Sequence, residues 1–180
     1  HRLMCGDATN IADVERLKVA IERKDLTSAQ FGAVSALWFE RHLYEPLLHL
    51  GGGGEITIRP VSLNAGEKRF VGDLRRWHTA NREALGQAEL YLLRNRSRGG
   101  GVGFFEAGNF HPDFMLWIAH EDRQCLAFID PKGLLNVGPE DPKVRFCDTI
   151  KEIQERLADS STVLEAFLIS TTPRALVRNR

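Results

Sequence analysis

The sequence predicts an α/β fold with a mixed sheet, in which helix, three strands, helix and strand follow one another (αβββαβ) after an N-terminal helical segment. Three observations support this prediction. Short apolar runs at 114–119 and 125–129 flank a polar turn of hairpin length. Apolar residues recur at helical spacing over 142–157, and another apolar run follows at 163–170. A crossover through that helix would make the last strand parallel to a central one, with the helix packed on the sheet.

The composition is ordinary for a soluble globular protein. Of the 180 residues, 43% are hydrophobic and 27% are charged, and the formal net charge is zero. Most DNA-binding proteins are basic, so contact with nucleic acid would need a local basic patch. The apolar runs are shorter than the roughly 20 residues of a membrane span, so no membrane partner is expected.

The cysteines and the first residue bear on the cellular setting. Three cysteines, odd in number and widely spaced, fit a reducing compartment and argue against a zinc site, which needs clustered ligands. The sequence begins with His1 rather than methionine and shows no signal peptide. We therefore expect a cytoplasmic protein, of which this chain is a fragment.

Residues 1–50 are expected to form a helical appendage. Apolar residues recur at helical spacing near the start of the chain, at Ile11, Val14, Leu17 and Ile21. The stretch 29–50 is apolar and periodic as well. Four glycines at 51–54 then make a flexible joint and the best candidate domain boundary. The main domain is accordingly expected at 55–173, followed by a basic tail at 174–180.

A strand and a long helix should open the main domain. Residues 55–59 alternate polar and apolar side chains, as a half-buried strand does. Asn64 is a favourable N-cap, and Glu67 three positions later completes a capping-box pattern. The apolar stripe that follows predicts a helix reaching about Arg94, with Asn81 and Gly86 as candidate breaks.

Three strands should follow this helix. The first is centred on Phe104-Phe105, and the hairpin strands at 114–119 and 125–129 come next. All three runs are rich in aromatic or branched residues and are bounded by Gly, Pro, Asn or Asp, as strands commonly are.

The hairpin would place two acidic residues opposite each other. Asp113 and Asp130 are equally far from the centre of the turn, so a symmetric turn makes them facing residues with Cβ atoms roughly 4.5–5.5 Å apart. Lys132 lies two residues after Asp130 and would point to the same face. Pro131 between them cannot donate a ladder bond, so we expect the strand to leave the sheet there.

Two facing carboxylates repel each other unless a positive group lies between them. A small all-oxygen site of carboxylates, waters and substrate phosphate suits Mg²⁺. A neighbouring lysine would hold or polarise a water, or neutralise charge on a phosphate. The alternative is that Asp113 is a turn residue and that Asp130 and Lys132 form a surface ion pair, which leaves their shared register unexplained.

This arrangement resembles the PD-(D/E)xK nuclease superfamily through Pro112-Asp113, the hairpin, and Asp130-Pro131-Lys132. The surrounding sequence, NFHPDFMLWI and QCLAFIDPKGL, is similar to the C-terminal nuclease domain of restriction-type DEAD/DEAH helicase subunits, such as type III restriction subunits. This resemblance covers about residues 55–172. The resemblance implies a restriction-endonuclease-like fold and a Mg²⁺-dependent DNA endonuclease, with Mn²⁺ able to substitute. The sequence departs from the commoner pattern in having Asp130 rather than Glu.

The resemblance also implies the roles of individual residues. The two aspartates would hold the metal ion, and Lys132 would orient or help deprotonate the attacking water. A Glu on the helix before the sheet often adds a ligand, and Glu67, in the text GEKRFVGDL, matches the pattern that opens that helix. Glu67 fits a simple capping role equally well. Glu89 and Glu106 are further candidates, and Glu106 also fits a strand end in solvent.

A locally basic stretch would suit DNA contact. Residues 67–98 contain eight Lys or Arg against four acids, and Arg94, Arg96 and Arg98 precede a glycine run. A flexible arginine-rich loop beside an acidic metal site fits contacts with the phosphate backbone, although a solvated polar loop has the same composition. His111 would contact substrate or serve a structural role.

The biological setting follows from the resemblance alone. It implies DNA cleavage in prokaryotic restriction and antiviral defence, with DNA and a helicase or ATPase module of the same full-length chain or complex as partners. The chain has no Walker motif, so such a motor would lie outside it. Two alternatives stay open: a catalytically silent DNA-binding or assembly module that keeps the nuclease fold, and a nuclease for RNA or for branched or modified DNA.

Overall fold

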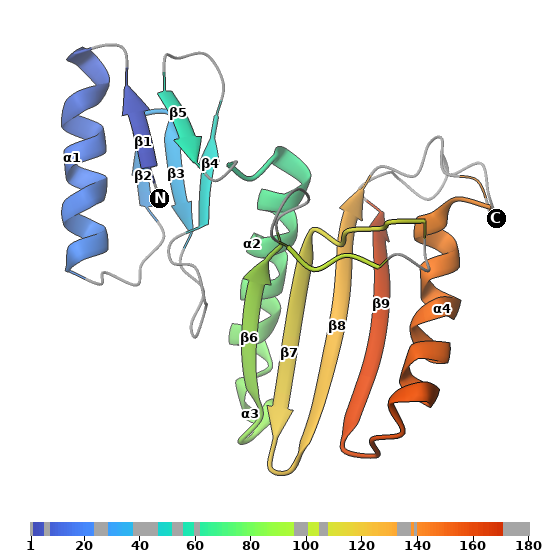
Figure 1. The fold of residues 1–180 in the computed structure, drawn as a ribbon. Helices are drawn as coiled ribbons and strands as arrows, with labels where there is room; N and C mark the ends of the chain where they lie inside the picture. Colours follow the sequence, from blue (N-terminus) through green and yellow to red (C-terminus); the bar gives the residue numbers. More distant parts are fainter. Residues whose placement is uncertain are drawn as a thin grey trace. The chain divides into compact units, whose positions relative to one another are not determined.

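A computed structural model of the chain divides into two compact units, residues 1–81 and 82–180 (Figure 1). The structure describes residues 2–5, 8–23, 29–37, 47–51, 56–59, 62–95, 101–104, 108–132, 138 and 140–170. The glycine run expected as a domain boundary falls within the first unit, and residues 52–55 lie outside the described part.

The described residues of the first unit form two small antiparallel sheets and two helices. Its strands are β1 (Arg2–Cys5), β2 (Ala29–Phe31), β3 (Val34–Leu37), β4 (Leu47–Leu50) and β5 (Ile56–Arg59). β1 pairs with β5, while β2, β3 and β4 form a three-stranded sheet in that order. α1 (Ala8–Glu22) packs on these strands and buries Leu17 in a core with Val34 and Leu48.

The prediction of helix throughout residues 1–50 is wrong beyond α1. α1 confirms the helical spacing between Ile11 and Ile21, but the apolar stretch after it forms the three-stranded sheet, and β1 has no counterpart among the expected elements. Gly32, with a φ of 54°, opens a two-residue turn that folds β2 back onto β3. A short apolar run fits a strand as well as a buried helix, and partner strands decide between them. The strand expected at 55–59 is confirmed as β5.

α2 (Ala65–Ala80) begins at the predicted capping box. The Asn64 side chain accepts a hydrogen bond from the Glu67 backbone N–H at 2.9 Å. The Glu67 carboxylate in turn accepts from the Asn64 backbone N–H at 2.8 Å. Both partners of the box are therefore in place, and they satisfy backbone donors that a helix start leaves without a partner.

α2 ends at Ala80, beside the candidate break at Asn81 and well before the predicted helix end near Arg94. α3 (Arg82–Leu85) adds a single turn, and Gly86, with a φ of 58°, then breaks the helical path. The residues that follow form β6 (Glu89–Arg94). The strand forms because alternate leucines of β6 are buried, which is the period of two of a strand rather than the period of a helix.

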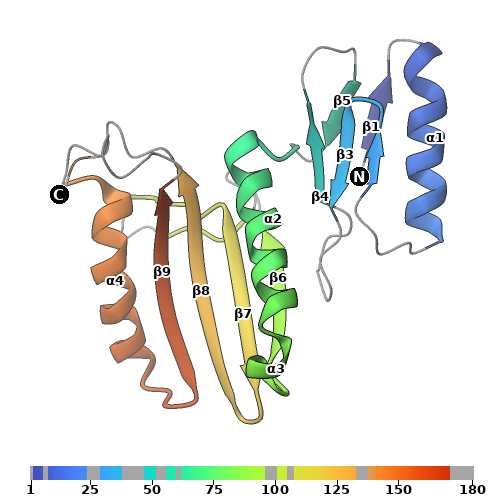
Figure 2. The same ribbon diagram turned by 180° about the vertical axis from the view of Figure 1, so that it is seen from behind.

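The second unit is built on a mixed four-stranded sheet, as predicted. Its further elements are β7 (Phe114–His120), β8 (Arg123–Lys132), α4 (Pro142–Leu157) and β9 (Thr162–Ser170). The strand order is β6–β7–β8–β9, in which β6, β7 and β8 are antiparallel and β9 is parallel to β8. Figure 2 shows α4 alongside the sheet on the crossover from β8 to β9. The hairpin, the crossover helix and the last strand are thereby confirmed.

The first strand of this sheet is not the predicted one. Phe104 forms an isolated bridge with Phe110, Phe105 lies outside the described residues, and β6 takes the position beside β7. The centroid of the Phe104 ring lies 4.5 Å from that of Phe146. The apolar character at Phe104 thus reflects burial in the core and not membership of a strand.

The pairing of β8 also extends further than predicted. β8 pairs with β7 as far as Ile129, but with β9 as far as Lys132. The prediction that the strand leaves the sheet at Pro131 is therefore wrong, because β8 stays paired with β9 through that residue. A proline is tolerated here because Pro131 lies two positions past Ile129, the last residue of β8 that pairs with β7.

α4 covers one face of this sheet. Pro142 occupies the first helical position, where a missing N–H does no harm. Phe146 and Ile150 are buried, whereas Leu157, expected on the same apolar face, is exposed. The strand side chains that share this core are Leu93, Met115, Trp117, Leu126, Phe128, Leu164 and Ala166. These contacts identify the residues of each strand that face α4.

Candidate functional site

Asp113 and Asp130 occupy facing positions at one end of the four-stranded sheet. The last pair of the β7–β8 ladder joins Phe114 to Ile129, so the next position along the ladder pairs the two aspartates. Asp113 keeps strand-like bonding on its other side, because its carbonyl accepts from the Asn95 N–H at 2.8 Å. The predicted hairpin register is therefore confirmed, up to the residues that flank the two acids.

The register also places the two acids on one face of the sheet. Met115 and Phe128 are ladder partners, and both pack in the core beneath α4. Since side chains alternate along a strand, Asp113 and Asp130, each two residues further on, share the α4 face. Lys132 shares it by the same alternation and is exposed.

The carboxylate of Asp130 is buried and only partly satisfied. Its side chain is 2% exposed, and Oδ2 forms an ion pair with Lys143 Nζ. Oδ1 is shielded from solvent and has no hydrogen-bond partner within the described part of the chain. A buried polar atom without a partner commonly costs about 1–3 kcal/mol, and more when it is charged. An ion or a water molecule that binds during function is one explanation for such an unsatisfied atom.

Lys143 comes from the first turn of α4 and was missed by the sequence reasoning. The crossover leaves β8 at the end that carries Asp130, so the start of α4 must return near that end. The Asp141 side chain, as N-cap, accepts from the Lys143 N–H at 2.9 Å and fixes this first turn. The sequence Asp141-Pro142-Lys143, an N-cap residue followed by a proline at the helix start, was the available signal.

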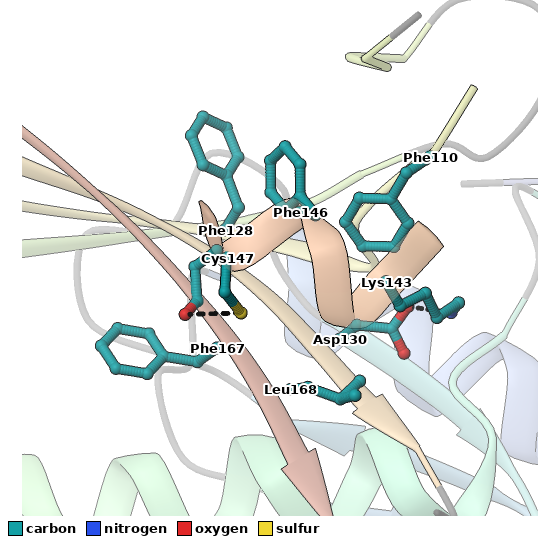
Figure 3. A pocket seen from close by; sticks show the side chains of 9 residues that line it. Phe110, Phe128, Asp130, Lys143, Phe146, Cys147, Phe167 and Leu168 are labelled. Atoms are coloured by element: carbon teal, nitrogen blue, oxygen red, sulfur yellow. Dashed lines mark hydrogen bonds and ion pairs between the residues drawn. The ribbon is translucent and has the colours of Figure 1, made fainter. Parts of the chain in front are cut away.

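A small hollow adjoins this ion pair, and Asp130 and Lys143 are among the residues that line it. Figure 3 shows Asp130 and Lys143 pointing toward each other, with the Phe110 and Phe146 rings nearby. Lys143 Nζ lies 5.3 Å from the centroid of the Phe110 ring. The hollow therefore combines an aromatic wall with a buried charged pair.

Asn95 braces the corner that leads into Asp113. Its side-chain amide donates to Pro112 O at 2.8 Å and to Val102 O at 2.7 Å. Its carbonyl oxygen accepts from the Val102 N–H at 2.9 Å. Asn95 is buried, so these bonds hold the backbone before Asp113 against the segment at residue 102. The sequence carried no signal for this role beyond the position of Asn95 at a strand end.

His111 takes part in the same corner. Its Nδ1 lies 3.1 Å from Val102 O. Its ring lies so close to Gly103 that a Cβ atom there would be 2.2 Å from His111 Cε1. These contacts give His111 a structural role in seating the segment at 102–103, which was one of its two expected roles.

The glutamates expected as further candidates lie in different settings. Glu67 is buried and makes the capping bonds of α2 in the first unit. Glu89 begins β6, where it accepts from Tyr91 Oη and faces Ala119 in the ladder. Glu89 thus lies at the opposite end of the sheet from Asp113, roughly 20 Å away along the strand. Glu106 lies outside the described residues.

The arginines expected to contact DNA are described only in part. Arg94 pairs with Phe114 in the ladder and so lies at the same end of the sheet as Asp113. Because the preceding Leu93 packs beneath α4, alternation puts Arg94 on the other face. Arg96 and Arg98 lie outside the described residues.

The donor set at Asp113 and Asp130 fits a hard divalent cation. Both are carboxylates on one face, and Asp130 Oδ1 is buried without a partner among the described residues. Mg²⁺ is commonly held by one or two carboxylates together with waters and substrate phosphate. A closed site of three or more His, Cys, Asp or Glu is not found among the residues that the structure describes.

Cys147 lines the hollow but offers no nucleophile at neutral pH. Burial raises the pKa of its thiol, and the negative charges of Asp148 and Glu165 raise it further. A thiol with a raised pKa stays protonated and unreactive. The chemistry of the site therefore falls to its carboxylates and lysines.

The described helices include none that is long and apolar enough to cross a membrane. Comparisons of the chain with protein-family models, with curated proteins and with solved structures gave no match.

Proposed function

We propose that the second unit carries a Mg²⁺-dependent phosphodiesterase site that cleaves DNA. The observation that supports this most directly is the buried carboxylate of Asp130, with one oxygen unsatisfied, facing Asp113 on one side of the sheet. A buried carboxylate that faces a second acid and has an unsatisfied oxygen is costly, and a bound cation would satisfy it. Lys132 at the exposed rim adds the positive charge that a phosphate would meet first.

Each residue of the site has its own role in the proposed reaction. Asp113 and Asp130 would hold the ion, which when bound polarises a phosphate and lowers the pKa of a water molecule. Lys132 would donate to a phosphate oxygen and offset the charge that builds there during attack by water. Asn95 would hold the backbone that carries Asp113, because a small displacement of a ligand weakens both binding and orientation.

The wider setting is part of the same proposal. Among the described residues from α2 onward, the elements follow the order αβββαβ with the single turn α3 inserted after α2, and acids lie at paired strand ends. Both features support a restriction-endonuclease-like fold. The sequence resemblance to PD-(D/E)xK nucleases supports a restriction or antiviral defence role in a prokaryotic cytoplasm. A helicase or ATPase partner would then supply the motor, and Mn²⁺ would substitute for Mg²⁺.

Plasmid cleavage tests the proposal. Supercoiled DNA is incubated with the chain and Mg²⁺ or Mn²⁺, and nicked or linear product is measured. Asp130→Asn and Lys132→Ala are expected to abolish product, while Lys132→Ala leaves DNA binding, followed by fluorescence anisotropy, nearly intact. Asp122→Asn is the matched control, since it changes an exposed aspartate in the turn of the same hairpin. Full cleavage by Asp130→Asn would refute the assignment.

The Asp130–Lys143 ion pair favours a second candidate. Lys143 already neutralises Asp130. A catalytically silent DNA-binding or assembly module would retain such a pair for its contribution to stability. In that case wild type would bind DNA without cleaving it, and the double variant Asp130→Asn/Lys143→Met would bind equally well. Parallel assays with RNA, branched DNA and modified DNA determine which phosphodiester substrate is cleaved.

A further inference from the structure

The contact between Asp130 and Lys143 satisfies only half of a buried carboxylate. Oδ2 is engaged by Lys143, whereas Oδ1 has no hydrogen-bond partner among the residues that the structure describes. A buried ion pair contributes to stability only when further hydrogen bonds satisfy its remaining lone pairs. The pair therefore balances the charge of Asp130 without completing the bonding of its carboxylate.

Lys143 has an alternative position within reach. The Lys143 side chain is 23% exposed and belongs to the first turn of α4. Rotation of this side chain can therefore bring the ammonium into water. Nζ also lies within cation–π distance of the Phe110 ring, at 5.3 Å from its centroid.

We propose that Lys143 is a resident cation, which neutralises Asp130 while the site lacks metal and withdraws when a divalent ion binds at Asp113 and Asp130. The inference rests on the metal site of the proposed function and adds a regulation of it. A metal ion beside Asp130 and the Lys143 ammonium would repel each other, so Lys143 lowers the metal affinity of the empty site.

A substrate phosphate would change this balance. It brings negative charge and oxygen ligands, which Mg²⁺ sites in nucleotide-processing proteins use together with carboxylates. Metal binding would therefore be favoured when a phosphate is present, and the site would load its ion together with the nucleic acid. When no phosphate is present, Lys143 balances the charge of the buried Asp130 carboxylate.

Titration of Mn²⁺ into the full chain at a fixed pH tests the inference without relying on activity. Lys143→Met is expected to bind Mn²⁺ about tenfold more tightly than wild type or better, because the competing charge is gone. Lys143→Arg retains the charge and should stay within about twofold of wild type. Lys151→Met is the matched control on the same helix, since Lys151 pairs with Glu165 instead.

The outcomes separate this inference from the proposed function. If wild type binds Mn²⁺, Asp130→Asn abolishes binding and Lys143→Met binds no more tightly, the metal site stands and the resident-cation inference is overturned. If none of these proteins binds Mn²⁺, both proposals are overturned. Circular dichroism monitors folding, with Lys143→Gln as a second uncharged variant. Variants that fold only when Mn²⁺ is added support the inference, and variants that stay unfolded with Mn²⁺ overturn it.

Discussion

Asp130 and Lys143, thirteen residues apart in the chain, meet as an ion pair where β8 ends and α4 begins. The strand contributes the buried carboxylate, and the first turn of the helix contributes the ammonium. A cation that binds the unsatisfied Oδ1 of Asp130 would lie close to the Lys143 ammonium on Oδ2, and the two positive charges would repel each other. Stability and metal binding are therefore linked through one pair of side chains.

Removal of either member of the pair should lower the free energy of unfolding, and the two losses should differ in size. Lys143→Met leaves a buried carboxylate without a counterion and is expected to cost roughly 3–5 kcal/mol. Asp130→Asn should cost less, because Lys143 can turn toward water. The double variant should be more stable than Lys143→Met alone. Urea unfolding of the metal-free chain measures all three differences.

The ion pair of Lys151 with Glu165 is the control for this cycle. Both side chains are substantially exposed, at 48% and 35%. Lys151→Met should therefore cost less than about 1 kcal/mol. A double variant at Asp130 and Lys143 that is no more stable than Lys143→Met would contradict the buried-pair account.

Replacement of Asn95 should weaken both stability and metal binding. Asn95→Ala removes three hydrogen bonds from a buried side chain and is expected to cost roughly 2–3 kcal/mol. Mn²⁺ affinity should fall as well, because the backbone before Asp113 loses its brace. Asn81→Ala is the control, since that side chain donates to Trp77 O at the end of α2. Unchanged Mn²⁺ affinity in Asn95→Ala would remove the positioning role.

The two expected roles of Glu67 can be separated by one substitution. Gln keeps the hydrogen bond of the capping box but removes the charge. We expect Glu67→Gln to leave stability within about 0.5 kcal/mol of wild type, while Asn64→Ala costs about 1 kcal/mol. Mn²⁺ affinity should also be unchanged in Glu67→Gln if the residue serves as a cap alone. A marked loss of affinity, measured by the same titration, would make Glu67 a ligand.

The buried thiols predict a loss of stability at high pH. Burial raises the pKa of both Cys125 and Cys147 above the ordinary value of 9.0. The folded chain then holds these protons more tightly than the unfolded chain, so their contribution is full below pH 9.0 and is lost as the pH rises above it. Between pH 7 and about 10, the free energy of unfolding should fall more steeply with pH for wild type than for the double variant Cys125→Ala/Cys147→Ala. Parallel curves would contradict this.

Local patterns in the sequence predicted the second unit well. The β7–β8 hairpin, α4 and β9 lie where apolar runs and turn residues placed them. The facing positions of Asp113 and Asp130 followed from one tight turn, because a short turn fixes the register. The capping box at Asn64 was also readable, since it is a contact between residues three positions apart.

The features that the sequence did not reveal depend on contacts between distant residues. β3 and the stretch before it look like an apolar helix until their partner strands are known. β6 was assigned to the end of a long helix, because the sequence marked Gly86 as a candidate break but did not show that the residues after it pair with β7. Lys143 required the crossover to be built before its ammonium could be placed at Asp130.

The two-residue turn at Glu121-Asp122 lies seven ladder positions from the acids, roughly 20–25 Å along the strands. Both turn residues are exposed, so many substitutions there should be harmless. A change of length is different, because a shift of the pairing by one residue turns every side chain of one strand to the opposite side. A single inserted or deleted codon in this remote turn would keep the sheet and yet separate Asp113 from Asp130.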